Sequence, residues 1–449
     1  MVWMQKLSEK DIDIFNTIKN ELKREEEGLE MIPSENNISP AVMQAMGSIF
    51  NNKYSEGYSH KRYYGGQEFV DKMEDIAVER AKKLFGTPHA NIQPYSGSPA
   101  NLAVYLACCE PGDTIMGLNL EDGGHLTHGF KVSATGKFYN SISYHLTAEG
   151  YTDLDEVRRL AREHKPKLIW CGATAYPREI PFKEFAEIAT EVGAYLAADI
   201  AHIAGLVIGG VHVSPSEFAD VITTTTHKTL RGPRGGMILV TNKGLLKDKD
   251  LAKKIDGAVF PGLQGGPHDH INAGKAVAFG EALKPEFKEY AKQIVLNSKA
   301  LAQGLMDNDI KLISNGTDNH LCLIDLTPFG NGKGLFVQEA LDEAGITVNK
   351  NTIPKEPFSP FYPSGIRLGT PSLTTRGMKE NEMLQIANII SEIIKLVAVQ
   401  EMSDDKEERM QKIKEFNLWL KENTRIKELR EEVKTLATSF PIYLGYVLE

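Results

Sequence analysis

The alternation of helical and short apolar runs between Asp71 and Val240 limits the fold of this chain more than any other feature. Helical runs such as DKMEDIAVERAKKLF and ANLAVYLACC alternate with the apolar runs DTIMGL, PKLIWCG, AYLAADIA, ADVITTT and GMILV. Short apolar runs between helices are typical of parallel strands that are buried on both faces of a sheet. The pattern therefore predicts an α/β domain in which helices cover both faces of a mainly parallel sheet.

The sequence on either side of this alternation predicts two further regions. Before it, SEKDIDIFNTIKNELKREEEGLE has the apolar spacing of an amphipathic helix, with Ser8 and Asp11 spaced like a capping box. After it, HLCLIDL, GLFVQEALDEAG, GIRLG and KENEMLQIANIISEIIKLVAV indicate a smaller α+β domain, followed by a charged tail of surface helix or coiled coil. We predict an N-terminal helical arm over residues 1–55, a large domain over 56–280 and a small C-terminal domain over 281–449.

The composition argues against several classes of protein. The 449-residue chain has a formal net charge of −9, whereas a general nucleic-acid binder needs a basic surface. Its four cysteines form no C-x-x-C pair, so a reducing compartment is expected. The N-terminus lacks the apolar region of a signal peptide, and Asp199 and His202 interrupt the longest apolar stretch. We expect a soluble cytoplasmic protein that binds neither nucleic acid nor membrane.

The stretch TTTTHKTLRGPRGG places Lys228 just after an expected buried strand, where the active sites of parallel sheets lie. Such a lysine can be a surface residue, a phosphate ligand or a nucleophile that forms a Schiff base. No Walker A or G-x-G-x-x-G pattern surrounds it, which weakens the nucleotide-binding interpretations. With an ordinary pKa near 10.4, about one lysine in 2,500 is neutral at pH 7, so a nucleophilic lysine needs a special environment.

Asp199 ends the preceding buried strand, in LAADIAH. The chain between Asp199 and Lys228 is long enough for one crossover connection, so both residues can end neighbouring strands at the same edge of the sheet. A carboxylate in a buried strand costs desolvation energy unless it has a partner. In enzymes that use pyridoxal phosphate, an aspartate holds the ring nitrogen protonated while a lysine forms the Schiff base. The alternative is that Asp199 only caps the following helix, AHIAG.

The segment PYSGSPANLAVYLACC is a candidate phosphate site. Ser98 is expected at the N-cap and Pro99 at the first helical position, while Ser96 and Gly97 offer a hydroxyl and bare backbone. Free N–H groups and the helix dipole favour a phosphate at such a helix start. An ordinary capped helix explains the motif equally well. His227 and the GPRGG loop are candidates for helping to hold the phosphate or for shaping the loop.

His125 and His128 in DGGHLTHG, together with HDH at 268–270, raise the question of a zinc site. No cysteine or glutamate completes a recognised ligand spacing, so we predict no metal. An imidazole stacked on a cofactor ring is the better interpretation of His125.

Taken together, the segments resemble one family, the serine (or glycine) hydroxymethyltransferases. The resemblance runs from about Pro33 to Asn388, and its motifs are highly specific in combination: KYSEGY, KRYYGG, SGSPAN, GGHLTHG, DIAHIAGL, TTTTHKTLRGPRGG, FPGLQGGP, TDNHL and SGIRLGTP. It implies a fold-type-I pyridoxal phosphate-dependent transferase with a mainly parallel seven-stranded sheet, helices on both faces and a smaller C-terminal α+β domain. The large domain would bind the cofactor.

The resemblance also implies roles for single residues. Lys228 would form the Schiff base, Asp199 would pair with the pyridinium nitrogen, and His125 would stack on the ring. Other cofactor contacts would come from Ser96, Gly97, Ser98, Thr174, His202, Thr225, His227 and Arg234. Arg367 would bind the amino-acid carboxylate with help from Ser34, although alone it could be a surface arginine.

Further implied residues bind the second substrate or belong to a neighbouring subunit. A reduced pterin would contact Leu120, Gly124, Leu126, Lys350 and Asn351. The neighbour in a homodimer, or in a dimer of dimers, would supply Tyr54, Glu56, Tyr63, Tyr64, Gly265 and Gly266. Glu56 would be the acid–base residue, whereas by itself it would count as an ordinary surface carboxylate.

The implied reaction is reversible and belongs to one-carbon metabolism and amino-acid biosynthesis. Serine and tetrahydrofolate, or a related tetrahydropterin, give glycine, the 5,10-methylene derivative and water through a pyridoxal phosphate aldimine. A pterin-independent, threonine-type aldolase would use the same lysine, aspartate and arginine, and a non-catalytic binding protein is a second alternative. Thr174 stands where many members have serine, and Glu121 and Asp122 flank the expected pterin site, which leaves the preferred pterin open.

Overall fold

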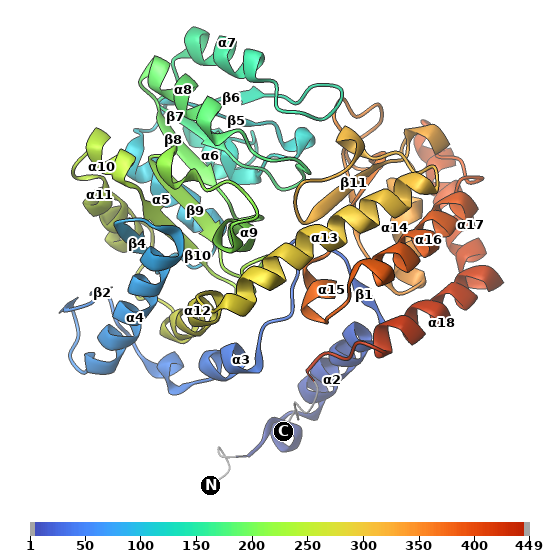
Figure 1. Ribbon diagram of the computed structural model, residues 1–449, viewed down its shortest axis with the longest axis horizontal. Coiled ribbons are helices and arrows are strands. Elements are labelled where there is room, and N and C mark those ends of the chain that lie inside the picture. The colour runs from blue at the N-terminus through green and yellow to red at the C-terminus, as the bar shows by residue number, and fades with distance from the viewer. Residues whose placement is uncertain (1–4, 444–449) are drawn as a thin grey trace.

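The computed structural model describes residues 5–443 and shows a large α/β part beside a smaller part formed by the C-terminal third of the chain (Figure 1). The long helix α13 (Pro285–Asp307) runs along both parts. Its first half contributes Phe287 and Ala291 to the core of the large part, and its second half contributes Leu301 and Leu305 to the core of the smaller one.

The central sheet has seven strands in the order β4-β10-β9-β8-β7-β5-β6. Every neighbouring pair is parallel except the two pairs that β10 makes with β4 and β9, so the prediction of a mainly parallel sheet is confirmed. The strands are β4 (His89–Asn91), β5 (Thr114–Leu118), β6 (Asn140–Tyr144), β7 (Leu168–Cys171), β8 (Tyr195–Asp199), β9 (Val221–Thr225) and β10 (Gly236–Val240).

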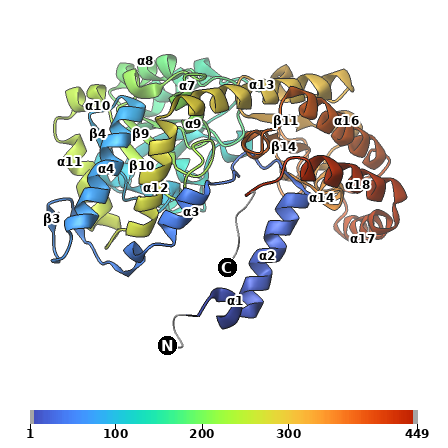
Figure 2. The same ribbon diagram turned by 60° about the horizontal axis from the view of Figure 1, so that its bottom comes forward.

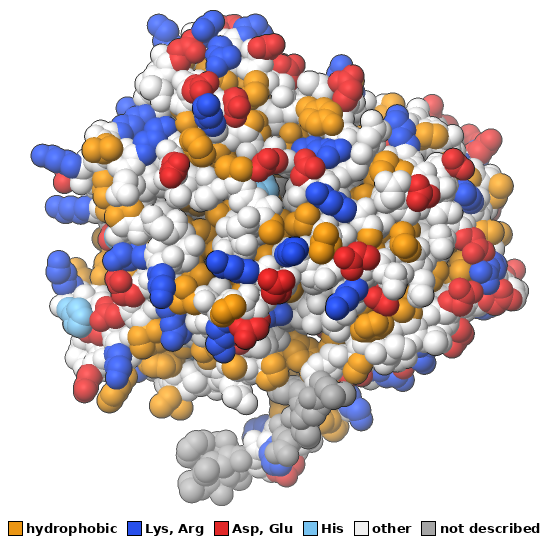
Figure 3. Space-filling model, in the orientation of Figure 1, with side chains coloured by type: hydrophobic (Ala, Val, Ile, Leu, Met, Phe, Trp, Pro, Cys, Tyr) orange, Lys and Arg blue, Asp and Glu red, His pale blue; other side chains and the backbone are white. Residues whose placement is uncertain are grey.

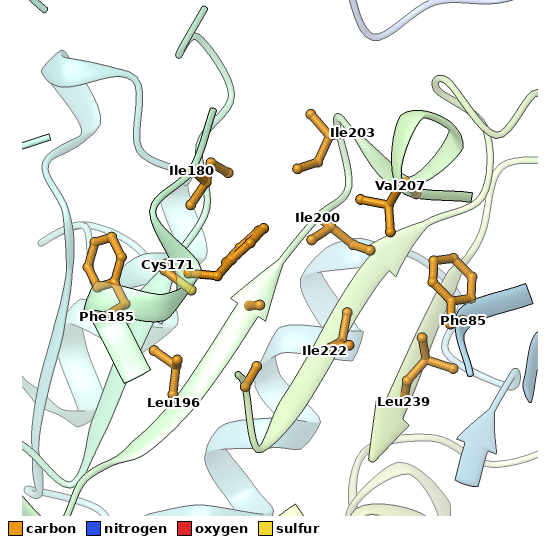
Figure 4. Packing of buried hydrophobic residues seen from close by; sticks show 14 of the residues in the cluster. Phe85, Cys171, Ile180, Phe185, Leu196, Ile200, Ile203, Val207, Ile222 and Leu239 are labelled. Carbon is orange, nitrogen blue, oxygen red and sulfur yellow. The ribbon is translucent and has the colours of Figure 1, made fainter. Parts of the chain in front are cut away.

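Successive residues of these strands enter two different hydrophobic cores, because side chains along a strand point to opposite faces. On β10, Met237 and Leu239 belong to one core, while Ile238 and Val240 belong to the other. Figure 4 shows part of the first core, where Leu239 packs near Phe85. Because both faces are buried in the middle of the sheet, inner strands such as β5, β7 and β10 appear in the sequence as apolar runs, whereas the edge strands β4 and β6 are polar.

Helices cover both cores. The first core is closed by α4, α7, α8, α9, α12 and the start of α13, and the second by α5 and α11. Local signals set several ends: Asp153 caps α7 by accepting from Glu156 N at 2.9 Å, and Gly86, at φ 64°, ends α4. The helices of this part are α3 (Pro40–Met46), α4 (Glu68–Phe85), α5 (Gly97–Cys108), α6 (Ala134–Phe138), α7 (Leu154–His164), α8 (Phe182–Val192), α9 (Ala204–Gly209), α10 (Asn242–Lys247), α11 (Leu251–Gly257) and α12 (Asp269–Ala282).

The smaller part packs helices against an antiparallel sheet of order β11-β14-β13. The charged tail forms α17 and α18, and each buries one face, through Phe416 on α17 and Leu429 on α18. The elements are β11 (Leu321–Asp325), α14 (Gly334–Glu343), β12 (Ile346–Thr347), β13 (Asn349–Asn351), β14 (Gly365–Gly369), α15 (Pro371–Thr375), α16 (Glu380–Val397), α17 (Lys406–Glu422) and α18 (Thr424–Thr438).

The N-terminal helices α1 (Leu7–Lys10) and α2 (Ile12–Glu27) bury no residue and project from the body (Figure 2). The predicted capping box was wrong. Asp11 interrupts the helix with non-helical backbone angles, and its side chain accepts from Ile14 N at 3.1 Å, which starts α2 there. The strand β1 (Leu29–Glu30) then pairs with β12, so the arm ends against the C-terminal part. The domain boundaries at residues 55 and 280 remain a prediction.

Arg376 joins the base of this arm to the end of the tail. Its guanidinium donates to the carbonyl oxygens of Glu25 and Gly28 at the end of α2, at 3.0 and 2.6 Å. It also donates to those of Ala437 and Phe440 at the end of α18, at 2.5 and 2.9 Å. The last carbonyls of a helix lack intrahelical partners and carry the negative end of its dipole, so one cation stabilises both helix ends.

The surface gives two further observations. Charged side chains of both signs are mixed over the face shown in Figure 3. Within residues 5–443, the structure contains no helix with the length and apolar character that crossing a membrane requires.

Candidate active site

The parallel strands β5, β7, β8 and β9 end along one edge of the sheet, at Leu118, Cys171, Asp199 and Thr225. Ligand sites of open α/β sheets lie at this edge. These strand ends and the loops that follow them contain eight of the predicted cofactor residues: His125, Thr174, Asp199, His202, Thr225, His227, Lys228 and Arg234.

Lys228 lies three residues after β9, in a turn whose backbone is fastened by neighbours. Its carbonyl oxygen accepts from Asn36 Nδ2 at 2.9 Å and from Arg231 N at 3.0 Å. Burial lowers the pKa of the Lys228 ammonium to about 8, although the charge of Asp199 opposes that shift. At that pKa about a tenth of the molecules carry a neutral amine at pH 7. The surroundings therefore increase the share of the neutral, nucleophilic form of this lysine.

Asp199 is held by three hydrogen bonds. Its Oδ2 accepts from Asn101 Nδ2 at 2.8 Å and from His128 Nε2 at 3.1 Å, and its Oδ1 accepts from Ala201 N at 3.0 Å. Burial by itself would raise the pKa of Asp199, but the hydrogen bonds and the neighbouring histidines lower it far below the usual range. The contact with Ala201 N is the local one expected if Asp199 caps the following segment. The carboxylate also stays ionised inside the protein.

The histidines around Lys228 are neutral at physiological pH. Burial lowers the pKa of His125 to about 4 and the pKa values of His227 and His320 to about 3. Burial, assisted by nearby cations, also holds the pKa of His202 well below its usual value, and His202 Nδ1 lies 3.1 Å from His320 Nε2. Neutral imidazoles can accept hydrogen bonds and stack on a ring without adding charge to the site.

The helix at the candidate phosphate site begins earlier than predicted. Helix α5 starts at Gly97 with Ser96 as its N-cap residue, so the placement of Ser98 at the N-cap and Pro99 at the first position was wrong. The extended backbone of Ser96 and its carbonyl, which accepts from Ala100 N at 3.1 Å, set this start. A Cβ on Gly97 would lie 2.8 Å from Thr225 Cγ2, so glycine is required there.

The surroundings of α5 fit an anionic group. The Ser96 side chain makes no capping hydrogen bond, which leaves the first amides of α5 available to a ligand. His227 Nδ1 is buried and has no hydrogen-bond partner within residues 5–443. Ser34, His227 and Arg234 line a pocket of about 250 Å³ beside this region, whose lining also includes Glu25, Glu30 and Glu35 but no residue of α5. Amides at a helix start and an unpartnered imidazole nitrogen are groups that a phosphate can satisfy.

Arg367 enters the site from β14 of the smaller part. Its Nε donates to Asn349 Oδ1 at 2.9 Å, and its Nη1 donates to the carbonyl of Thr174 at 2.5 Å. Among the described residues no carboxylate forms an ion pair with it, and burial lowers its pKa to about 10. A largely buried guanidinium without an anionic partner attracts a carboxylate, which it can bind through two N–H donors.

The residues predicted to line a pterin site come from two adjacent segments. One contains the 3₁₀ turns Leu120–Asp122 and Leu126–His128, and the other is β13. Thr352 Oγ1 links them by donating to the Glu121 carbonyl at 2.6 Å. Asp122 is buried and lies 2.7 Å from His145 Nδ1. Leu120, Gly124, Leu126, Lys350 and Asn351 all lie in or beside these segments.

The residues predicted to serve a neighbouring subunit form a separate cluster in this chain. Tyr64 Oη donates to Glu56 Oε2 at 3.4 Å, and the rings of Tyr54 and Tyr64 meet edge to face at 5.7 Å. The cluster continues to Gly265 and Gly266, which lie against Glu56 and Tyr54, and to exposed Tyr63. No hydrogen bond, ion pair or ring contact joins these residues to Lys228 or Asp199 within residues 5–443.

Several residues at the site had no predicted role. Asn101 and His128 hold Asp199, Asn349 holds Arg367, and His320 holds His202. His128 also stacks on Trp170, with ring centroids 5.1 Å apart. A sequence signal existed for Asn101, because an amide in the otherwise apolar run ANLAVYLACC needs a buried partner.

The histidines considered as metal ligands have other partners here. Ligand atoms of His125, His128 and Asp199 lie within 4.8 Å of one another, which is close enough for an ion. However, His125 Nδ1 lies 2.7 Å from Thr127 Oγ1, and His128 bonds to Asp199 directly. In HDH, His268 stacks on Tyr95 with centroids 4.0 Å apart. The absence of a metal remains a prediction.

Comparison with known proteins identifies the family. The sequence model described as serine hydroxymethyltransferase matches residues 7–390. The chain belongs to the serine hydroxymethyltransferase family. A curated serine hydroxymethyltransferase from a Nitratiruptor species is 57% identical over 391 residues, which cover 87% of this chain and 92% of that protein.

Membership of the serine hydroxymethyltransferase family confirms the predicted fold and enzyme class, a fold-type-I pyridoxal phosphate-dependent transferase. The residues present fit that cofactor: a lysine of lowered pKa, an ionised aspartate and free helix amides lie at one sheet edge. The helices α17 and α18 lie beyond the part of the chain that the family model matches.

Proposed function

We propose that this serine hydroxymethyltransferase converts serine and a tetrahydropterin, such as tetrahydrofolate, reversibly into glycine, the 5,10-methylene derivative and water. The convergence of Lys228, Asp199 and Arg367 is the observation that carries the proposal. It combines an amine of lowered pKa, a carboxylate that stays ionised, and a guanidinium without an anionic partner. These are the groups that an amino-acid substrate and a pyridine cofactor require.

The reaction divides between the cofactor and the chain. Pyridoxal phosphate, when bound, supplies the electron sink for breaking the Cα–Cβ bond of serine. Lys228 would supply the amine that holds the cofactor. Asp199, ionised by its contacts with His128 and Asn101, would keep a proton on the ring nitrogen. Arg367 holds the carboxylate of the amino acid with its planar pair of donors.

A second copy of the chain completes the proposed site. No hydrogen bond, ion pair or ring contact joins the cluster around Glu56 to Lys228 or Asp199 within residues 5–443, and Tyr54 and Tyr63 are 62% and 77% exposed. Large exposed aromatic side chains are typical of interface residues. We infer a homodimer, or a dimer of dimers, in which Glu56 of one protomer moves the protons needed to transfer the one-carbon unit in its partner's site. The four buried free cysteines support a reducing compartment such as the cytoplasm.

The function is tested by supplying the purified protein with serine, with and without tetrahydrofolate, and measuring glycine. We expect rapid glycine formation only when the pterin is present. Efficient cleavage of allo-threonine combined with no effect of pterin on serine would favour the aldolase. Cofactor binding without turnover of either substrate would indicate a binding protein.

Replacing Arg367 with lysine should raise the KM for serine by roughly 10- to 100-fold, because a charge-assisted bidentate contact is lost while the charge is kept. Affinity for pyridoxal phosphate should stay unchanged. Steady-state kinetics and a cofactor titration measure the two effects. Arg178→Lys is the matched control, since Arg178 pairs with Asp318 at 2.9 Å. An unchanged KM for serine in Arg367→Lys would place the carboxylate elsewhere.

Mixing two inactive variants should restore activity if the active sites are shared. Lys228→Ala and Tyr54→Ala/Glu56→Gln alter residues that meet only across the interface of such a dimer. In an equal mixture that exchanges subunits freely, half of the dimers are mixed and each has one unaltered site, so about a quarter of wild-type activity should return. Mixing Lys228→Ala with Asp199→Asn is the control. Both residues belong to the same centre within a protomer, so every site of a mixed dimer carries one of the two changes and no comparable rescue is expected.

Subunit exchange must be shown independently, for example by energy transfer between differently labelled protomers. If the subunits exchange completely but activity stays at the level of the parent proteins, the shared site is contradicted. Glu56 would then be an ordinary surface carboxylate.

A further inference from the structure

Lys275 is a lysine in the middle of α12 with only 1% of its surface exposed. Its ammonium donates to the carbonyl oxygens of Ile92 at 2.5 Å, Pro94 at 3.2 Å and Gly236 at 3.0 Å. An ammonium has three N–H donors, so each one has an acceptor. Within the described part of the chain no carboxylate forms an ion pair with Lys275, and Glu74 acts on it only from a longer distance.

The three carbonyls belong to the backbone that leads into the candidate phosphate site. Ile92 and Pro94 lie between β4 and the start of α5, and Gly236 begins β10 beside them. Gly236 N donates to the carbonyl of Pro94 at 3.1 Å. A side chain on Gly235 would collide with that of Lys275, so the ammonium, the loop and the strand are packed without spare room.

Gln264 holds the intervening residues of the same loop. Its Nε2 donates to the carbonyl of Gln93 at 3.0 Å, and its Oε1 accepts from Tyr95 N at 2.9 Å. The carbonyls of residues 92, 93 and 94 are therefore all held by α12 or by the segment just before it. The amides at Gly97 and Ser98 open α5, so they have no intrahelical acceptors and are available to a ligand.

We propose that Lys275 is a positioning residue that holds the loop before α5 so that its helix-start amides can bind the cofactor phosphate. This proposal rests on the function proposed above. A buried ammonium without a contacting anion is costly, and a phosphate on the far side of the loop would offset part of that cost. Burial lowers the pKa of Lys275 to about 7, as expected for a cation that lacks a close anionic partner.

The test compares two ligands that differ only in the phosphate. Apoprotein is titrated with pyridoxal phosphate and with pyridoxal, and binding is followed by absorbance. In Lys275→Met, affinity for pyridoxal phosphate should fall by about 10-fold, the scale of one lost charged hydrogen bond, while pyridoxal should be affected by less than about 2-fold. Inorganic phosphate should also compete less well. Lys333→Met is the matched control, because Lys333 is 5% exposed and donates to the Ala398 carbonyl in the smaller part.

Each result decides the proposal. If Lys275→Met does not fold, Lys275→Gln, which keeps two donors, must show the same selective loss at smaller amplitude. Equal weakening of both ligands in a folded variant would show a general structural role, and unchanged affinity for pyridoxal phosphate would show no role; either overturns the proposal. Equal affinity of the unaltered protein for both ligands would contradict the phosphate site itself, and with it the proposed use of the cofactor.

Discussion

Replacement of Lys228 by alanine is expected to abolish covalent attachment of pyridoxal phosphate and to lower serine turnover by at least roughly 10³-fold. The physical reason is that the amine of Lys228 lies at the edge of the sheet that carries Asp199. Burial lowers the pKa of the Lys228 ammonium to about 8, although the charge of Asp199 opposes that shift. Lys275, the other lysine whose pKa burial brings near neutrality, has all three donors bound to carbonyl oxygens.

Borohydride reduction of the cofactor-loaded protein, followed by peptide mapping, measures the attachment. The cofactor mass should appear on the peptide that contains Lys228 and should disappear in Lys228→Ala. Lys243→Ala is the matched control, because Lys243 is partly buried and donates to the Phe218 carbonyl instead. A label on any other lysine of the unaltered protein would overturn the assignment of the whole site.

Asp199→Asn should leave a folded protein that binds pyridoxal phosphate but turns over serine roughly 10³- to 10⁴-fold more slowly, a loss comparable with that of catalytic carboxylates elsewhere. An amide cannot keep the ring nitrogen protonated, so the electron sink is weakened. The variant also removes the negative charge that accepts from Asn101 and His128.

The measurement combines kcat for serine with circular dichroism and a cofactor titration on the same preparation. Asp220→Asn supplies the control, since Asp220 is also a buried carboxylate but accepts from Leu196 N at the opposite end of the sheet. That change should alter stability more than the kinetics of the remaining folded protein. Near-normal turnover by Asp199→Asn would show that Asp199 has only a structural role, through its contact with Ala201 N.

Much of the large domain could be predicted from the sequence because its signals are local. The inner strands are buried on both faces, so most of them are apolar runs that can be found without knowing their order, whereas the polar edge strands β4 and β6 gave no such signal. Helix starts were less predictable. Ser98 and Pro99 have the chemistry of a helix start, yet α5 begins at Gly97, with the extended residue Ser96 as its N-cap. The close approach of Gly97 to Thr225, which belongs to a strand far along the chain, is a contact that the local sequence does not reveal.

The candidate site divides in the same way. Lys228 and Asp199 were predicted at one edge, and β8 and β9 are indeed neighbouring parallel strands whose carboxyl ends carry them. The partners that hold the site residues were not predicted. His128 bonds to Asp199, His320 to His202 and Asn349 to Arg367, and each becomes a partner only when packing brings its side chain within hydrogen-bond distance.

By itself the sequence determined the α/β class, the family and the residues able to perform the chemistry, since these depend on patterns and side-chain types along the chain. Only the tertiary structure decided which groups are ionised, where α5 begins, and how Lys275 and Arg376 hold backbone carbonyls from distant segments. The reason is that pKa values and buried hydrogen bonds depend on desolvation and on distances between residues far apart in the chain. Such distances exist only once the fold has formed.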